Sequence, residues 1–297
     1  MKKKSFLGVI FVGLLIVGYI GLKFYATNTA EVRMNKSIAE VSGFVNIDYE
    51  KISVDIPSLH VHLFDVRLSV SPIVNFFISS DLVVKINEII VKNIDEDSDI
   101  PMSLAVDLNG IDIPLSEMGA EFSTILKEFD HKEEFLINLA LDYKCNVEKN
   151  EFKLKEISIG ASDLGEIEVS LGLGNVNLDL EEIANLITTY QQITLLNAKI
   201  SYIDDSLFEK AIKLTAQNEN QTVEELKREI IEELDKEISE EKDKFVKNGL
   251  GEIKEFINKP QKLSISASPA NRLSFSRMSQ VDEPKEFIKL LGLKIKS

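Results

Sequence analysis

Two of the three histidines, His60 and His62, lie two residues apart in the stretch HVH. Side chains at positions i and i+2 of a β-strand share a face, so the pair could give two ligands to a zinc or copper ion. Such a site needs three or four ligands, and His131 is the only other histidine. Because no local cluster of Cys, His or Asp surrounds the pair, we interpret both as strand side chains facing solvent or a groove. We expect no metal site and no cofactor.

Two other features could carry chemistry. The single cysteine, Cys145, cannot form an internal disulfide and has no neighbouring histidine to activate it, so we interpret it as a packing residue. Asp95, Asp97 and Asp99 alternate like the start of a calcium loop, but the turn glycine and the closing glutamate of an EF-hand are missing. The sequence also lacks a phosphate-binding loop, a dinucleotide fingerprint, a nucleophile elbow and a zinc-protease helix. We predict no catalytic residue and a protein that is not an enzyme, although carboxylate-only chemistry would leave no sequence trace.

The charge of the chain restricts its partners. The 297 residues carry a formal net charge of −15, and the first 23 contribute four lysines and no acid, so the remainder carries −19. A domain this acidic repels phosphate backbones, which argues against a nucleic-acid partner and against broad adsorption on anionic headgroups. Hydrophobic residues make up 44% of the chain, which is typical of a globular protein.

The N-terminus has the pattern of an uncleaved membrane anchor. Three lysines precede an apolar run, and residues 6–26 would form about 31 Å of helix, close to the roughly 30 Å of a bilayer core. Cleavage after Ala26 or Ala30 would place Phe24 or Asn28 at the −3 position, where signal peptidase requires a small residue. By the positive-inside rule, residues 1–5 form a cytoplasmic stub. Residues 27–42 are then a linker or juxtamembrane segment, and residues 43–297 form a domain outside the cytoplasm.

Alternating apolar residues predict a β-rich domain. Apolar positions change parity within 43–56 and again within 59–70, which indicates a bulge or bend, or two short strands in each run. Two runs, one from Phe135 to Tyr143 and one from Ile167 to Leu173, have the pattern of half-buried antiparallel strands with one face packed and the other wet. The loop EKNE at 148–151 reads as a hairpin connection. After residue 70, strands are predicted at 82–94, 103–113, 135–144, 152–160, 164–174, 193–203, 262–268 and 272–276, and this set includes the two runs above.

Helices interrupt these strands. The 3.6-residue period predicts helices within 114–129, 178–190 and 204–214, the last beginning at a cap-like Asp204. The longest spans 222–248, with capping-box spacing between Thr222 and Glu225 and Gly249 as its stop. It is strongly charged and has a thin apolar seam. The predicted class is α+β: a transmembrane helix, then a large antiparallel, curved β-sheet or β-sandwich with interspersed helices and one long charged helix.

The order of these segments resembles a known family. A single anchor followed by FVNIDYEKISVDIPSLHVHLFDVRLSVSP and then LVVKINEIIVKNID is similar to the opening of AsmA-like and YdgA-like bacterial envelope proteins. The resemblance implies an inner-membrane anchor and a β-rich periplasmic domain. For the AsmA group it also implies a curved sheet with an apolar concave face, linked to phospholipid handling or outer-membrane assembly. No catalytic residue is carried over, and the chain is short for that group.

Two functional hypotheses follow. In the first, a single-pass inner-membrane protein exposes its domain to the periplasm or the cell exterior, where it binds a phospholipid or other apolar ligand, or aids envelope assembly with a protein partner. In the second, the protein is a non-catalytic scaffold that recruits a partner through the acidic helix 222–248.

Overall fold

The computed structural model describes residues 22–36, 38–39, 45–70, 83–95, 101–114, 124, 126–127, 129, 134–176, 190–281 and 283–297. Among these residues, no helix is long and apolar enough to cross a bilayer. The predicted anchor lies outside the described residues except for positions 22–26. The predicted helix 178–190 lies outside them apart from Tyr190, as does most of 114–129.

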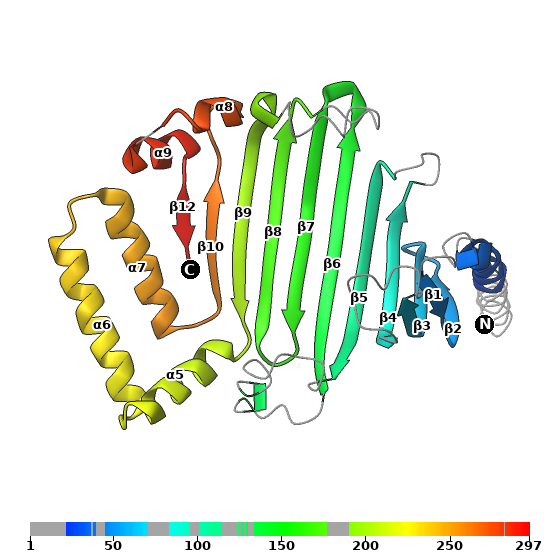
Figure 1. The fold of residues 1–297 in the computed structure, drawn as a ribbon, viewed down its shortest axis with the longest axis horizontal. Coiled ribbons are helices and arrows are strands. Elements are labelled where there is room, and N and C mark those ends of the chain that lie inside the picture. Colours follow the sequence, from blue (N-terminus) through cyan, green and yellow to red (C-terminus); the bar gives the residue numbers. More distant parts are fainter. Residues whose placement is uncertain are drawn as a thin grey trace, which may run out of the picture.

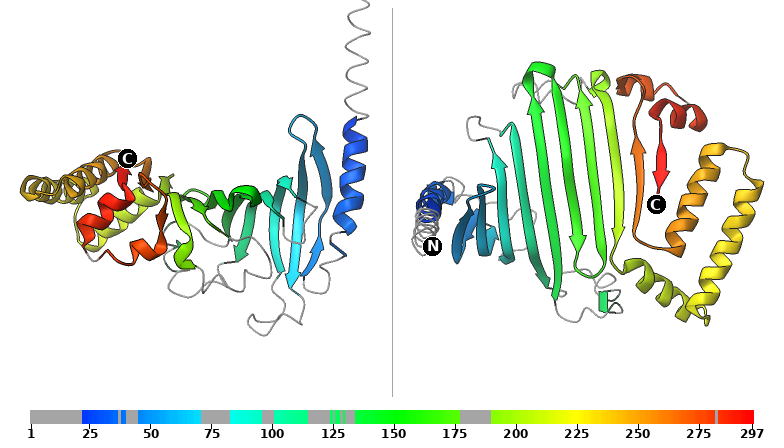
Figure 2. Two further views of the ribbon diagram at one scale, coloured as in Figure 1. Left: turned by 90° about the horizontal axis from the view of Figure 1, so that it is seen from above. Right: turned by 180° about the vertical axis from the view of Figure 1, so that it is seen from behind.

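The described strands form one antiparallel sheet in the order β1-β3-β4-β5-β6-β7-β8-β9-β10-β12, with β2 also paired to β3 and β11 to β9 (Figure 1). Seen from above, the sheet is twisted and curved (Figure 2). The predicted α+β class with a large antiparallel sheet is therefore confirmed. The strands are β1 (Val45–Asp48), β2 (Lys51–Asp55), β3 (His60–Val70), β4 (Val83–Ile94), β5 (Ser103–Pro114), β6 (Glu134–Asn146), β7 (Glu151–Ala161), β8 (Gly165–Gly174), β9 (Thr194–Asp204), β10 (Lys262–Ala267), β11 (Leu273–Ser274) and β12 (Lys294–Lys296).

A helix formed by residues 22–36 lies against the β1–β2 end of the sheet (Figure 2). The Thr27 hydroxyl accepts a hydrogen bond from the Val54 backbone at 3.3 Å, and the Tyr49 hydroxyl donates to Asn35 at 2.9 Å. The helix thereby covers an edge that would otherwise expose unpaired backbone groups. The segment 27–42, expected as a linker or juxtamembrane region, thus contains a helix docked on the sheet.

The predicted parity changes coincide with a line of irregular backbone that crosses four strands. The first run divides into two strands, β1 and β2, and the second is one strand whose Asp65 has φ 52°. The same line continues through Asn87 of β4 and Gly110 of β5, whose φ is 66°. The Gly110 amide donates to Asn138 of β6 at 2.8 Å. We call this line the seam. Along each strand, the apolar residues change from odd to even positions, or the reverse, at the seam, so apolar side chains on both sides of it reach the same core cluster.

The β6–β7 connection is a hairpin, as predicted. A short turn η2 (Val147–Lys149) is capped by the Asn146 side chain, and Asn150 has φ 52°. The predicted strand 272–276 is wrong in its second half. Only Leu273–Ser274 pair with β9, and α8 (Phe275–Met278) follows because the Ser274 hydroxyl caps its first turn through the Arg277 amide.

The single helix predicted over 222–248 is wrong: the structure has α6 (Val223–Glu240) and α7 (Lys244–Asn258). The capping box of Thr222 and Glu225 begins α6 as predicted. The chain turns at Glu241, and Asp243 starts a new helix by accepting hydrogen bonds from the amides of Phe245 and Val246.

Gly249 does not end a helix, because it lies buried inside α7. A Cβ atom at this position would come within 2.8 Å of Cδ1 of Ile295 in β12. The glycine therefore allows close packing of helix against strand. The remaining helices are α5 (Leu207–Asn218) and α9 (Pro284–Leu291). The predicted start of α5 at Asp204 is wrong, because Asp204 ends β9 and Ser206 is the N-cap, but the Asp204 side chain still accepts a hydrogen bond from the Phe208 amide at 2.8 Å.

Candidate functional site

Strand register aligns apolar side chains into two rows on one face of the sheet, which we call the apolar face. The first row contains Val91, Val106, Leu141, Ile157, Val169, Ile200, Ile265 and Ile295. The second row contains Ile89, Leu108, Leu139, Ile159, Ile167, Tyr202 and Leu263. The first row crosses eight strands, and seven spacings of about 4.8 Å make it roughly 34 Å long.

The centre of the apolar face is exposed to solvent. Five isoleucines there, which we call the isoleucine patch, retain about half of their side-chain exposure: Ile157 46%, Ile159 49%, Ile167 47%, Ile200 55% and Ile265 48%. They lie on the four adjacent strands β7, β8, β9 and β10. The sequence prediction that the apolar side of these strands is packed is therefore wrong for Ile167, although it holds for Phe135, which is 4% exposed.

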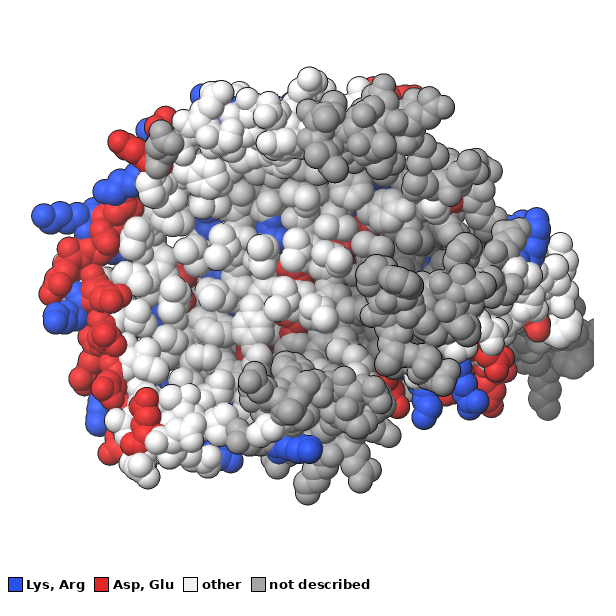
Figure 3. Space-filling model, viewed as in Figure 1, with Lys and Arg blue, Asp and Glu red and all other residues white. Residues whose placement is uncertain are grey.

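Packed clusters border the isoleucine patch. Leu126 and Phe129 contact Phe135 at one end of the strands. At the other end, residues of α8 and α9 join Leu195 and Leu273 in a second cluster. The surface over the central strands carries few charged atoms in Figure 3, whereas charged side chains gather along α6 at the left edge. The patch is therefore an open apolar surface within a well-packed frame.

Tyr202 is the polar side chain in the second row, and its hydroxyl is bound within the protein. The Tyr202 hydroxyl donates to Asp204 at 2.5 Å, and its ring packs edge-on against Phe256 of α7. Burial raises the pKa of Tyr202 well above its usual value, and the hydrogen bond and the charge of Asp204 raise it further. The apolar face consequently presents hydrocarbon to a ligand and little that could hydrogen-bond or react.

The opposite face of the sheet is polar and contains the histidine pair. His62 Nδ1 lies 2.9 Å from Glu88 Oε1, and the other Glu88 oxygen accepts from Asn109 at 3.2 Å. The His62 ring stacks on Phe64 with centroids 6.1 Å apart. In the described part of the chain, no three His, Cys, Asp or Glu side chains come together as a metal site. His62 therefore takes part in a side-chain network across β3, β4 and β5.

The remaining sequence candidates do not join a site. Cys145 is half-buried and free, and burial raises the pKa of its thiol, which disfavours the reactive thiolate. Asp95 accepts from the Met102 amide at 3.3 Å, as expected for a turn residue. Asp97 and Asp99 lie outside the described residues.

The functional feature that sequence reasoning missed is the exposure of the isoleucine patch. Alternation along each strand showed that the residues share a face, but exposure depends on whether another element covers that face.

Comparisons with known proteins place no function on this surface. A family model described as "Uncharacterized protein" matches residues 158–297, a stretch from the middle of β7 to the C-terminal residue. No curated protein matches the chain.

Proposed function

We propose that this is a membrane-anchored envelope protein that holds the acyl chains of a phospholipid on its isoleucine patch. In this proposal residues 6–26 span the cytoplasmic membrane with the N-terminus in the cytoplasm. The sheet domain then lies on the periplasmic or extracellular side, and the protein performs no catalytic step.

The exposed isoleucine patch is the observation that carries the proposal. Burying an isoleucine side chain completely stabilises by about 1.5–3 kcal/mol, so covering a half-exposed one is worth about 1 kcal/mol. The five residues together offer about 5 kcal/mol of gross association energy. Soluble monomers rarely leave contiguous apolar surface of this kind uncovered, and where they do it marks a binding site.

The composition of the isoleucine patch favours lipid chains over a protein partner. Protein interfaces are enriched in Tyr, Trp, Met and Arg, whereas this surface is formed by branched aliphatic residues on adjacent strands. An acyl chain needs a long surface without hydrogen-bonding groups. The isoleucine patch crosses four adjacent strands, and three spacings of about 4.8 Å make it roughly 14 Å wide, close to the ~15 Å depth that the chains of one leaflet fill in a bilayer core.

The position of the N-terminal helix supports access to lipid. Residues 22–36 continue from the apolar run and dock on β1 and β2 through Thr27 and Asn35. A helix that begins in the bilayer and is fixed to the sheet would hold the domain close to the membrane surface.

A binding measurement tests the proposal. The full-length protein in detergent is titrated with a phospholipid that carries a pyrene-labelled acyl chain. The variant Ile159→Thr/Ile167→Thr/Ile200→Thr keeps β-branched residues on three adjacent strands but makes the patch polar. It should bind roughly a hundredfold more weakly, from about 3 kcal/mol of lost apolar contact.

The matched control is Val147→Thr, an equally conservative change at a residue that is 59% exposed in the β6–β7 turn. It should bind as the wild type does. If the triple variant binds with wild-type affinity, the isoleucine patch is not the lipid site and the proposal fails.

A second candidate function is that of a scaffold, favoured by the placement of α6. Among the described elements, α6 makes substantial contact only with α5 and α7, and it forms the outer edge of the molecule (Figure 1). It carries eight acidic and three basic side chains, a net charge of −5. Such a ridge suits a basic protein partner.

Neutralising the ridge separates the two functions. The variant Glu229→Gln/Glu233→Gln/Glu240→Gln should lose a basic protein that co-purifies with the wild type, while phospholipid binding stays unchanged. An unchanged set of co-purifying proteins would eliminate the scaffold function.

A further inference from the structure

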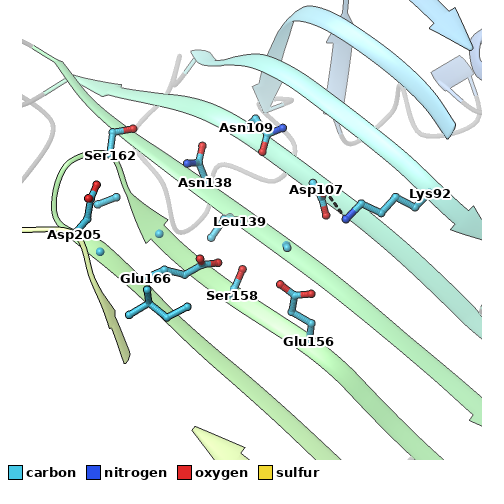
Figure 4. A pocket seen from close by; sticks show the side chains of 15 residues that line it. Lys92, Asp107, Asn109, Asn138, Leu139, Glu156, Ser158, Ser162, Glu166 and Asp205 are labelled. Carbon is cyan, nitrogen blue, oxygen red and sulfur yellow. Dashed lines mark ion pairs between the residues drawn. The ribbon is translucent and has the colours of Figure 1, made fainter. Parts of the chain in front are cut away.

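A cavity of about 440 Å³ lies on the polar face of the sheet, opposite the isoleucine patch (Figure 4). It extends from β4 to β9, and small residues at Ala140, Gly160 and Ala161 leave room for it. At one end, Lys92 and Asp107 form an ion pair at 2.5 Å and neutralise each other. The lining is otherwise rich in oxygen acceptors.

Three carboxylates give the cavity a negative charge without a counter-ion. Glu156 on β7, Glu166 on β8 and Asp205 just after β9 all line it. Across the described ranges, none of the three carboxylates has an ion-pair or hydrogen-bond partner, in contrast to the paired Glu151 and Glu168 on the same strands. Lys155 and Lys199 line a smaller neighbouring cavity together with Glu156, so it is the lining of this cavity, and not the whole surrounding surface, that is negatively charged.

Ser158 gives an independent indication of a ligand. Its side chain is 4% exposed and lines the cavity, and Figure 4 shows it between Glu156 and Glu166. Within the described part of the chain the Ser158 hydroxyl has no hydrogen-bond partner. Because the rest of the residue is buried and its hydroxyl has no partner among the described residues, the hydroxyl is free to hydrogen-bond to a ligand in the cavity.

The arrangement selects the class of ligand. The carboxylates are spread around a large cavity, and no described group of three acidic, histidine or cysteine side chains converges as a metal site. Ammonium groups at intervals along a carbon chain match separated carboxylates better than one metal ion does. We propose that this cavity binds a small organic cation that carries two or more ammonium groups.

Calorimetric titration of the full-length protein with spermidine at low ionic strength tests the proposal. The wild type should show saturable binding of one ligand per chain. Glu156→Gln and Glu166→Gln should each weaken binding about tenfold, since each removes a charge-assisted hydrogen bond. Ser158→Ala should weaken it about fivefold, because it removes a neutral hydrogen bond.

The matched control is Glu151→Gln, which removes the same charge from the same strand. Glu151 pairs with Arg272 at 2.6 Å and does not line the cavity. Its spermidine affinity should stay within twofold of the wild type. Equal weakening in all three glutamate variants would show non-specific attraction to an acidic protein and would overturn the proposal, as would absence of saturable binding. Displacement of spermidine by Mg²⁺, beyond the effect of NaCl at the same ionic strength, would instead assign a metal cation.

This inference is independent of lipid binding. The cavity and the isoleucine patch lie on opposite faces, so the threonine triple variant should keep wild-type spermidine affinity.

Discussion

Replacement of Gly110 by alanine tests the seam, the feature that keeps the apolar residues of four strands on one face. Gly110 has φ 66°, a conformation that costs an L-residue about 1–2 kcal/mol. A Cβ atom here would lie 2.3 Å from Nδ2 and 3.0 Å from Cβ of Asn87 on the neighbouring strand. Asn87 is exposed and can turn its amide away, so the contact adds about 1 kcal/mol.

The expected destabilisation of Gly110→Ala is therefore about 2–3 kcal/mol. For a chain of this size, 1 kcal/mol corresponds to roughly 2 °C in Tm, so circular dichroism should show a fall of about 4–6 °C. A Gly110→Ala/Asn87→Ala double variant loses the contact with the Asn87 amide group, but the contact with the Cβ atom of residue 87 and the backbone strain stay. The free energy of unfolding of the double variant should therefore be up to about 1 kcal/mol higher than that of Gly110→Ala alone.

Gly251→Ala is the matched control, because the chemical change is the same and the environment is opposite. Gly251 lies inside α7, and an added Cβ would meet no atom within 4 Å. Alanine favours a helix interior over glycine, so Tm should rise by an amount that corresponds to about 0.5–1 kcal/mol. A Gly110→Ala protein with wild-type Tm, or an equal fall for both variants, would refute the assignment of a strained backbone at the seam.

Three further predictions concern the helices and the cysteine. Thr222→Ala should lower the free energy of unfolding by about 1 kcal/mol in urea titrations, because the capping box of α6 is lost; an unchanged value would contradict that role. Backbone hydrogen bonds lower the pKa of Asp243, so its stabilisation is present above the unfolded-state value of about 3.9 and is lost as pH falls through the lower folded pKa. Asp243→Asn should therefore show a weaker loss of Tm below pH 4 than the wild type, and parallel curves would exclude this contribution. Burial raises the pKa of Cys145, so iodoacetamide at neutral pH should label it several-fold more slowly in the folded than in the urea-unfolded protein; equal rates would show an accessible thiolate.

Much of the sheet was predictable because alternation is a local signal. The strands from 83 to 204 lie within a few residues of their predicted bounds, and the two predicted parity changes mark where the seam begins. The continuation of the seam to Asn87 and Gly110 was not predicted. It becomes visible only when strand register places four separate irregularities side by side.

The long helix shows the limit of local propensity. Residues 222–248 contain no glycine or proline and are mostly Glu, Lys, Arg and Leu, so the sequence favours one helix. The break before α7 occurs because the Asp243 side chain caps a new helix, which competes with continuation of α6. Gly249 was predicted to end the helix because glycine commonly does so, but it lies within α7. Its actual role depends on Ile295, which lies far along the chain and reaches α7 only through β12.

Both candidate sites also depend on register. Ile159 and Ile167 lie on two strands joined by a short turn, yet their pairing, and that of Ile167 with Tyr202, follows only from the assembled sheet. Glu156 and Ser158 were visible as alternating polar residues. The cavity between them and Glu166 could not be inferred without the arrangement of β4 to β9.

Photochemical cross-linking tests the lipid-binding account most directly. The full-length protein is reconstituted with a phospholipid that carries a photoactivatable group near the end of an acyl chain, irradiated, digested and mapped by mass spectrometry. Outside the predicted anchor, the account predicts adducts on β7 to β10, centred on the isoleucine patch, and their loss in the threonine triple variant. Adducts confined to residues 6–26, or equal labelling of α6 and the sheet, would contradict it.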